Sequence, residues 1–236
     1  MSRLDELAAQ WEVAPDGVAA LRALLDVLAT DDTAPTTVRE PARAIDAHVA
    51  DALSGLLVPE LAAAGRVADI GAGAGVPGLV LAAARPGMGV TEVESVGRKC
   101  AFMERLVAAM GLANARVVSA RAEEWADGRE ACDAVTARAL AALPVLVEYA
   151  APLLRPGGAL VAWKGTPEAG EVADGDHAAQ FLGLGPARVV DVPAFPGAQR
   201  RSLYVYLKVG SLPNGYPRRP GMARKRPLQA STRAQG

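Results

Sequence analysis

The sequence predicts an α/β protein in which a largely parallel β-sheet is covered by helices on both faces. From residue 66 onward, apolar runs of β type alternate with helical patterns, as is typical of parallel strands joined by crossover helices. A glycine-rich segment directly follows the first of these runs, which is typical of a strand that leads into a ligand-binding loop. Before residue 60 only helical spacing is found, so we expect a helical extension at the N-terminus.

Seven runs of β type predict seven strands. They are Val67–Ile70, Val90–Glu94, Arg116–Ser119, Ala134–Ala137, Ala159–Trp163, Arg188–Val192 and Leu203–Lys208. No long helix fits between the last two runs. This arrangement resembles the Rossmann-like, mostly parallel sheet of class I S-adenosylmethionine-dependent methyltransferases, in which the final strand runs antiparallel.

The N-terminal segment has apolar residues at three- and four-residue steps, the spacing of one helix face. Two helices precede a polar break at residues 31–37, and a third begins at about Pro41 with Ile45, Val49 and Leu53 on one face. We expect three parts: a helical extension at 1–60, a methyltransferase-like sheet domain at 61–209 and a basic tail at 210–236.

The composition is that of an ordinary globular protein. With 236 residues, of which 51% are hydrophobic, the chain can bury one substantial core. No apolar run approaches the roughly 20 residues that span a bilayer, and the first residues lack a signal peptide's apolar core, so we expect a cytoplasmic protein without membrane contact. Cys100 and Cys132 form no metal-ligand spacing, so we expect buried, reduced thiols and no metal. No apolar surface stripe demands a partner subunit, and we expect a monomer.

The strongest functional signal lies in residues 67–78. Three alternating glycines follow a strand that ends in Asp69. They are Gly71, Gly73 and Gly75. Without a Cβ, glycines let the backbone turn sharply and approach a ligand closely. Glu94 closes the next predicted strand, where a carboxylate can accept hydrogen bonds from ribose hydroxyls, so the pattern predicts a nucleotide-type site.

Two classes of cofactor are compatible with this pattern. Residues 73–78 match the dinucleotide fingerprint G-x-G-x-x-G, which would indicate an NAD(P)-dependent oxidoreductase. The carboxylate of Asp69 at the strand tip suits the cationic amine and sulfonium of S-adenosylmethionine better than it suits a pyrophosphate. We therefore favour S-adenosylmethionine and keep the oxidoreductase as an alternative.

Charge is distributed unevenly along the chain. The formal net charge is −1, but residues 209–236 contain six Lys or Arg and no Asp or Glu, which leaves −7 for the remainder. A basic, proline-containing end is typical of a segment that binds a polyanion; the alternative is a solvated end that only aids solubility. We predict that the tail binds RNA chiefly through Arg218 and Arg219, and that its removal leaves cofactor binding unchanged.

Short segments from Thr36 to Leu228 occur in the order of a known family. Besides the glycine loop with its Pro77, they are residues 37–41 (TVREP), 48–53 (HVADAL), 94–99 (ESVGRK), 119–124 (SARAEE), 137–139 (ARA), 163–165 (WKG) and 216–221 (YPRRPG). The ordered set resembles the RsmG (GidB) family of bacterial 16S rRNA guanine-N7 methyltransferases. This resemblance implies methylation of a guanine in the 530 loop of 16S rRNA, position 527, with rRNA or the small ribosomal subunit as partner.

The resemblance also implies roles at the cofactor. The backbone of Gly71–Val76 would hold the methionine part, and Glu94 the ribose. Ala122 and Glu123 would flank the adenine, although Glu123 also fits a helix-start acid favoured by the helix dipole. Arg138 ends the fourth strand near the expected methyl group, where it would orient the cofactor carboxylate or an RNA phosphate.

The RNA contacts that the resemblance implies are basic residues outside the glycine loop. They are Arg39, Lys164, Arg201, Arg218 and Arg219. Lys164 fits an ordinary surface lysine equally well. The chain departs from the family at Ala34-Pro35, where Asn-Leu is usual, so any contribution of that asparagine is absent here.

The implied reaction needs no general base. Guanine N7 carries a lone pair and no proton, so we expect catalysis by positioning and little dependence on pH. We accordingly interpret His48 as a packed polar residue of its helix and not as a catalytic group. A third hypothesis, a non-catalytic RNA-binding protein with a vestigial cofactor site, conflicts with the intact glycine loop.

Overall fold

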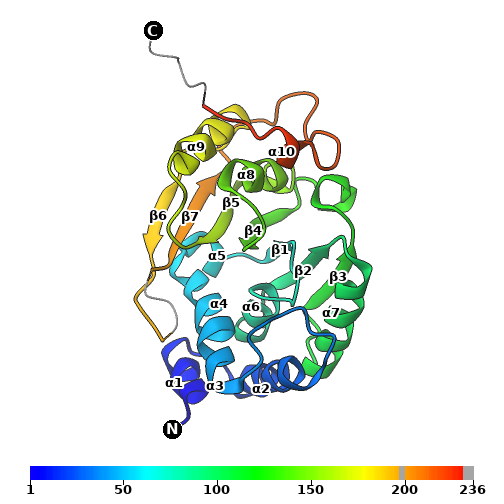
Figure 1. The fold of residues 1–236 in the computed structure, drawn as a ribbon, viewed down its shortest axis with the longest axis vertical. Coiled ribbons are helices and arrows are strands. Elements are labelled where there is room, and N and C mark those ends of the chain that lie inside the picture. The colour runs from blue at the N-terminus through cyan, green and yellow to red at the C-terminus, as the bar shows by residue number, and fades with distance from the viewer. Residues whose placement is uncertain (197–199, 231–236) are drawn as a thin grey trace.

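The computed structural model describes residues 1–196 and 200–230, and in these residues it contains one seven-stranded sheet (Figure 1). The strand order is β3-β2-β1-β4-β5-β7-β6, in which β1 to β5 run parallel and β7 is antiparallel to both of its neighbours. The strands are β1 (Arg66–Ile70), β2 (Gly89–Glu94), β3 (Ala115–Ser119), β4 (Cys132–Arg138), β5 (Leu154–Lys164), β6 (Arg188–Asp191) and β7 (Ser202–Leu207). The predicted α/β class, the seven strands and the antiparallel last strand are confirmed.

Helices cover both faces of this sheet. The helices of the N-terminal half, together with α6 and α7, pack on one face, whereas α8 and α9 pack on the other. Their bounds are α1 (Arg3–Gln10), α2 (Pro15–Thr30), α3 (Pro41–Ala44), η1 (Ile45–Ala50), α4 (Asp51–Leu53), η2 (Ser54–Leu57), α5 (Pro59–Ala62), α6 (Gly78–Ala84), α7 (Gly97–Met110), η3 (Ala122–Glu124), η4 (Ala126–Gly128), α8 (Leu143–Ala150), α9 (Glu171–Phe181) and α10 (Met222–Lys225). Among the described residues, no helix is both long and apolar enough to cross a bilayer.

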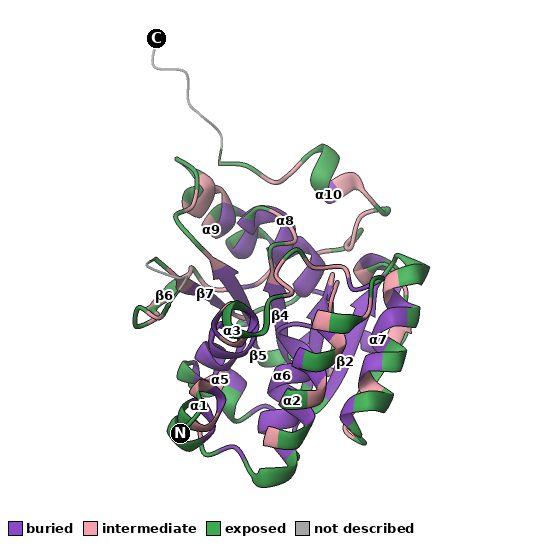
Figure 2. Cartoon of the chain, turned by 60° about the horizontal axis from the view of Figure 1, so that its bottom comes forward, coloured by how far each residue is buried: buried purple, intermediate pink, exposed green. Residues whose placement is uncertain are grey.

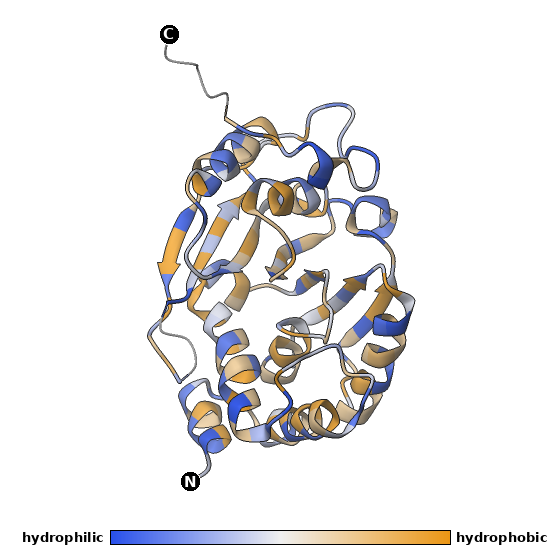
Figure 3. Cartoon of the chain, viewed as in Figure 1, coloured by the Kyte–Doolittle hydropathy of each residue, from blue (hydrophilic) through white to orange (hydrophobic). Residues whose placement is uncertain are grey.

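Burial follows the amphipathic patterns of the sequence. In Figure 2 the outward sides of α2 and α7 are exposed and their inward sides are buried. The hydropathy colouring of Figure 3 shows the same division, with hydrophobic colour prevailing along the strands. Core residues of α2 such as Leu21 and Leu24 belong to the same hydrophobic cluster as Val67 of β1, so the N-terminal helices and the sheet share one core. Cys100 and Cys132 are buried free thiols, as expected.

The third N-terminal helix is a composite of α3, η1, α4 and η2. The Glu40 side chain caps its start by accepting hydrogen bonds from the Ala42 and Arg43 amides. Its middle, η1, is a π-helix, a form found mostly as single turns at functional sites. The expected apolar face is present, because Val49 and Leu53 are buried, but the same stretch also buries Asp51.

The C-terminal segment folds back onto the body of the protein. After β7 the chain crosses α8 and α9, and the short helix α10 lies beside α8 (Figure 1). The Tyr216 ring packs edge-on against Phe181 with centroids 5.5 Å apart, and Ala223 is buried. For residues 210–230 the alternative of a solvated end is therefore wrong. Arg233, one of the six basic residues of the tail, lies outside the described residues.

Candidate functional site

A pocket of about 420 Å³ lies at the carboxyl ends of β1 to β4, beside the glycine loop. Gly71 and Gly73 adopt φ values of +64° and +60°, which side chains with a Cβ rarely adopt. A Cβ on Gly71 would collide with the side chain of Leu140, which lines the pocket. The space beside Gly73 is open, so a ligand can approach the backbone there. The loop thus has the close-approach geometry that its sequence predicts.

Glu94 is fixed at the end of β2 and lines this pocket. Its Oε1 accepts hydrogen bonds from the amides of Ser95 (2.8 Å) and Val96 (2.9 Å). Among the described residues, the partners of its Oε2 are the Gly73 amide at 3.3 Å and the Lys99 ammonium at 3.7 Å. Oε1 is thus held firmly, whereas Oε2 has longer contacts. Oε2 is therefore suited to accept a hydrogen bond from a ligand hydroxyl.

Ala122 and Glu123 follow β3 and line the same pocket. They belong to η3, a three-residue 3₁₀ turn, and no α-helix starts there. A helix-dipole role for Glu123 therefore has little support, since the dipole of a single turn is small. Its Oε1 accepts a hydrogen bond from the Gly221 amide at 3.2 Å.

Asp69 does not face the pocket, contrary to the role that the sequence suggested for its charge. The carboxylate is 1% exposed, its Oδ2 accepts from the Gly78 amide at 3.0 Å, and its Oδ1 accepts from the Thr136 hydroxyl at 2.8 Å. Burial raises the pKa of Asp69 to about 6, against the effect of these hydrogen bonds. Because strand side chains alternate, Asp69 points beneath the loop and fixes the start of α6.

Sequence analysis overlooked a second acid, Glu92, which is paired in register with Asp69 on the neighbouring strand. Glu92 is completely buried, and neither carboxylate oxygen has a hydrogen-bond partner among the described residues. Burial, and then the charge of Asp69, raise the pKa of Glu92 well above its ordinary value, which favours the neutral form of this carboxyl. Its side chain fills the space where a Cβ on Gly78 would lie. A glutamate inside an otherwise apolar strand, V-T-E-V, was the available signal.

Arg138 lies at the carboxyl end of β4 as predicted, but its side chain does not line the pocket. It turns toward the N-terminal helices, where its guanidinium donates to the Ala47 carbonyl (2.9 Å) and to Asp51 Oδ2 (2.8 Å). Arg201 donates to the other oxygen, Asp51 Oδ1, at 2.7 Å. Asp51, which is 1% exposed, thus binds both arginines. We had expected Arg138 at the methyl group and Arg201 at RNA. Helix periodicity gave no signal for this buried carboxylate.

His48 is packed as expected. Its Nε2 lies 3.1 Å from the Val38 carbonyl and 3.2 Å from Thr36 Oγ1, so it ties the loop of residues 34–38 to the helix. Burial, and then the charge of Arg138, lower the pKa of His48, which keeps the ring neutral at neutral pH. The ring does not line the pocket.

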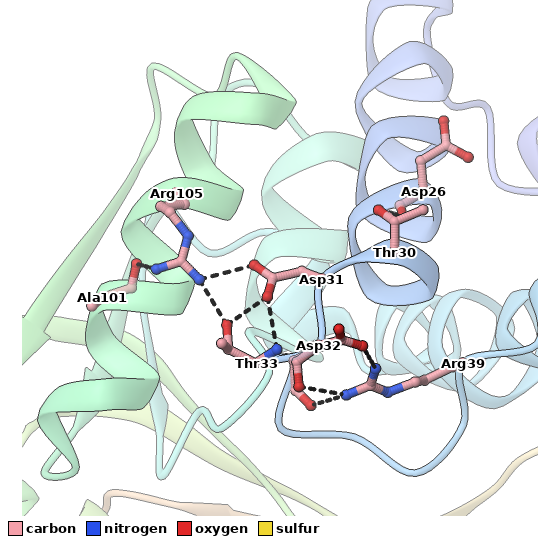
Figure 4. A network of polar contacts seen from close by, with 9 residues as sticks. Asp26, Thr30, Asp31, Asp32, Thr33, Arg39, Ala101 and Arg105 are labelled. Atoms are coloured by element: carbon pink, nitrogen blue, oxygen red, sulfur yellow. Dashed lines mark hydrogen bonds and ion pairs between the residues drawn. The ribbon is translucent and has the colours of Figure 1, made fainter.

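Most of the basic residues expected at RNA have carboxylate partners. Arg39 donates to Asp32 and to two loop carbonyls, beside the Arg105–Asp31 pair (Figure 4). Lys164 pairs with Glu171 at 2.5 Å. The remaining pairs are Arg201 with Asp51, described above, and Arg218 with Glu148.

Arg219 differs from its neighbour. It is exposed and makes no ion pair among the described residues. Arg218 donates from two nitrogens to both oxygens of Glu148, a carboxylate on α8 that is 2% exposed. Two neighbouring basic residues of the tail therefore have different surroundings, one paired with a buried carboxylate and the other exposed to solvent.

Comparison with solved structures defines the class. The fold resembles an S-adenosylmethionine-dependent methyltransferase, SibL, with a TM-score of 0.59 and 14% identity over 87% of this chain and 74% of that one. It also resembles a 16S rRNA (adenine(1408)-N(1))-methyltransferase from Catenulisporales acidiphilia, with a TM-score of 0.52 and 18% identity over 68% of this chain and 93% of the other. The chain has the fold of a class I, Rossmann-like methyltransferase.

Sequence comparison defines the family. Residues 20–203 match the family model GidB, described as rRNA small subunit methyltransferase G. The protein of that name from Rubrobacter xylanophilus is 44% identical over 199 residues, 81% of this chain and 76% of the relative. The one from Symbiobacterium thermophilum is 38% identical over 92% of both chains. The chain belongs to the rRNA small subunit methyltransferase G family, as its ordered segments indicated, and is a methyltransferase.

Proposed function

We propose that this protein transfers the methyl group of S-adenosylmethionine to N7 of a guanine in 16S rRNA, at position 527 in the 530 loop. The observation that supports this proposal is the pocket between the glycine loop, Glu94 and Glu123, in a chain of the rRNA small subunit methyltransferase G family. Family membership argues against the oxidoreductase and the non-catalytic alternatives. The 16S rRNA, as free RNA or in the small subunit, is the proposed partner.

The residues of the pocket fit this cofactor. The open space beside Gly73 allows the methionine part to lie against the loop backbone. Glu94 Oε2, at the end of β2, is the acceptor for a ribose hydroxyl. Glu123 stands where the adenine would lie. When bound, S-adenosylmethionine supplies a methyl group on a positively charged sulfur.

A second cavity, of about 540 Å³, adjoins the first across Leu140 and is where we place the guanine. Lys164 lines it, and Glu171 fixes the position of the lysine ammonium. Guanine N7 holds an unshared electron pair, so the protein has to align it with the methyl group and remove no proton. Positive charge moves from the sulfur to the base during transfer, which makes a neutral or weakly acidic wall favourable.

We propose that RNA is bound by exposed basic residues near the two cavities. They are Arg98, Arg121, Arg219, Lys225 and Arg226. They replace the basic residues that form ion pairs with carboxylates within the protein. Arg98 follows β2 and Arg121 follows β3, so both lie at the edge of the sheet that carries the pocket. Arg39 and Arg201 would act indirectly, by holding the loop and the helix described above.

Mapping of 7-methylguanine in 16S rRNA tests the proposal directly. Cells that lack the protein should lose the modification at position 527, and the purified protein with S-adenosylmethionine should restore it. Single-turnover rates should vary little between about pH 6 and pH 9, because no acid or base titrates in the reaction. Methylation at another base, or binding of NADH without binding of S-adenosylhomocysteine, would contradict the proposal.

A further inference from the structure

The segment from Tyr216 to Ala230 is anchored on the body by several independent contacts. The Arg218 guanidinium pairs with both oxygens of the buried Glu148, and the Tyr216 ring packs edge-on against Phe181 of α9 at 5.5 Å. Farther along, the Ala230 amide donates to Asp174 Oδ1 at 2.9 Å. These contacts fix both ends of the segment across α8 and α9.

Between these anchors the segment reaches the pocket assigned to the cofactor. The Gly221 amide donates to Glu123 Oε1, and the Arg224 guanidinium donates to the Leu140 carbonyl at 3.0 Å. Arg224 lines both the pocket that contains Glu94 and Glu123 and the neighbouring cavity that contains Lys164. The segment is therefore part of the wall of both cavities.

The contact at Glu123 orients this carboxylate. Gly221 adopts φ +80°, a conformation that favours glycine, and this directs its amide to one oxygen of Glu123. Among the described residues, the other oxygen, Oε2, accepts no hydrogen bond and is available to the pocket. An exocyclic amine such as that of adenine is a donor that suits this free oxygen.

We propose that the C-terminal segment is a functional part of the cofactor site: Gly221 positions Glu123 for the adenine amine, and Arg224 closes the adenosine end of the pocket. The inference rests on S-adenosylmethionine as the cofactor. It reverses our expectation that the tail could be removed without effect on cofactor binding. Arg218 acts through its anchor on Glu148, and is a positioning residue for the whole segment.

Titration calorimetry of the full chain with S-adenosylhomocysteine, without RNA, tests this. Arg224→Ala should raise the Kd at least fivefold, and Arg218→Ala about tenfold. Arg218→Lys should recover part of the loss, because an ammonium still pairs with Glu148 but without the two parallel bonds. Arg129→Ala is the matched control, since Arg129 is exposed and lies outside both cavities. Arg224→Ala should retain the wild-type melting temperature, because Arg224 is exposed and donates to the main-chain carbonyl of Leu140 from the protein surface.

Two further measurements separate positioning from general damage to the fold. Arg224→Ala should raise the KM for S-adenosylmethionine by a larger factor than it lowers kcat at saturating cofactor. In the wild type, S-adenosylhomocysteine should slow hydrogen exchange at Gly221 and its neighbours. Equal Kd values for the wild type, Arg218→Ala and Arg224→Ala, or unchanged exchange at Gly221, would overturn the inference alone. Failure of the wild type to bind S-adenosylhomocysteine would overturn both this inference and the proposed function.

Discussion

Two carboxylates, Asp51 and Glu92, are equally inaccessible but have opposite surroundings. Asp51 is 1% exposed and receives guanidinium hydrogen bonds on both oxygens. Glu92 is 0% exposed, and neither oxygen has a partner among the described residues. Burial without a partner favours the neutral form, whereas two cationic donors stabilise the charged form. Burial by itself therefore does not indicate whether an acid stabilises the fold; its partners decide.

The largest effect is expected when Asp51 loses its charge. Asp51→Asn leaves Arg138 and Arg201 without an anionic partner in a partly buried site, and should lower the free energy of unfolding by about 3 kcal/mol. Urea denaturation measures the change. Glu60→Gln is the control, since Glu60 forms a more exposed pair with Arg188 and should matter much less. A loss no larger than that of the control would show that the two arginines find other partners.

Glu92 should respond in the opposite direction. Glu92→Leu replaces an unpartnered buried carboxyl by an apolar side chain of similar size, and should raise the free energy of unfolding at pH 8 by about 2 kcal/mol. The same denaturation experiment measures it. Glu92→Gln, which removes the titrating group but keeps a polar one, should gain less. A lower free energy of unfolding for Glu92→Leu would mean that the Glu92 carboxyl forms a stabilising hydrogen bond in the folded protein.

The gain from Glu92→Leu should depend on pH. The pKa of Glu92 is raised in the folded protein, so the folded state binds more protons than the unfolded state as pH rises above about 4.5. Wild-type stability attributable to this group is thus fully present below that pH and falls as pH increases. We expect the gain of the leucine variant to be smaller at pH 5 than at pH 8, by about 1.4 kcal/mol for each pH unit over which the folded state keeps the proton and the unfolded chain has lost it. A gain that is constant across this range would place the pKa of Glu92 at its ordinary value.

The smallest effect is expected at the surface pair of Arg39 and Asp32 (Figure 4). Asp32 is fully exposed, and exposed ion pairs contribute little to stability because water screens them. Arg39→Ala should leave the urea midpoint unchanged within error. A clear loss of stability would show that its hydrogen bonds to the Asp32 and Ala34 carbonyls stabilise the whole fold and not only the position of the loop.

Local patterns were sufficient where backbone geometry carries the function. The glycine turn and the position of Glu94 at the end of a strand are present as expected, because a strand, a turn that needs positive φ and a carboxylate at the next strand end are all defined within a few residues; their binding of a cofactor stays a prediction. The seven strands were predicted for the same reason, since β-type runs separated by helical ones restrict the sheet to few arrangements.

Contacts between distant segments could not be predicted in this way. Arg138 meets Asp51 across 87 positions of the chain, and Arg218 meets Glu148 across 70. Each arginine taken alone resembles an exposed charge, so the sequence predicted an RNA contact for Arg218, and for Arg138 a contact with the cofactor carboxylate or an RNA phosphate. The buried carboxylates that pair with these arginines are brought to them by packing of distant segments. No local periodicity of the sequence indicates such a pair.

The sequence by itself determined the class of fold, the family and the position of the glycine loop, because these depend on local backbone preferences and on the order of short segments. Only the tertiary structure decided which charges face ligands and which neutralise one another. It turned Asp69 beneath the loop, left Glu92 without a partner and brought Gly221 to Glu123. The physical reason is that the state of a charged side chain depends on the groups within a few ångströms of it, and folding alone brings those groups together.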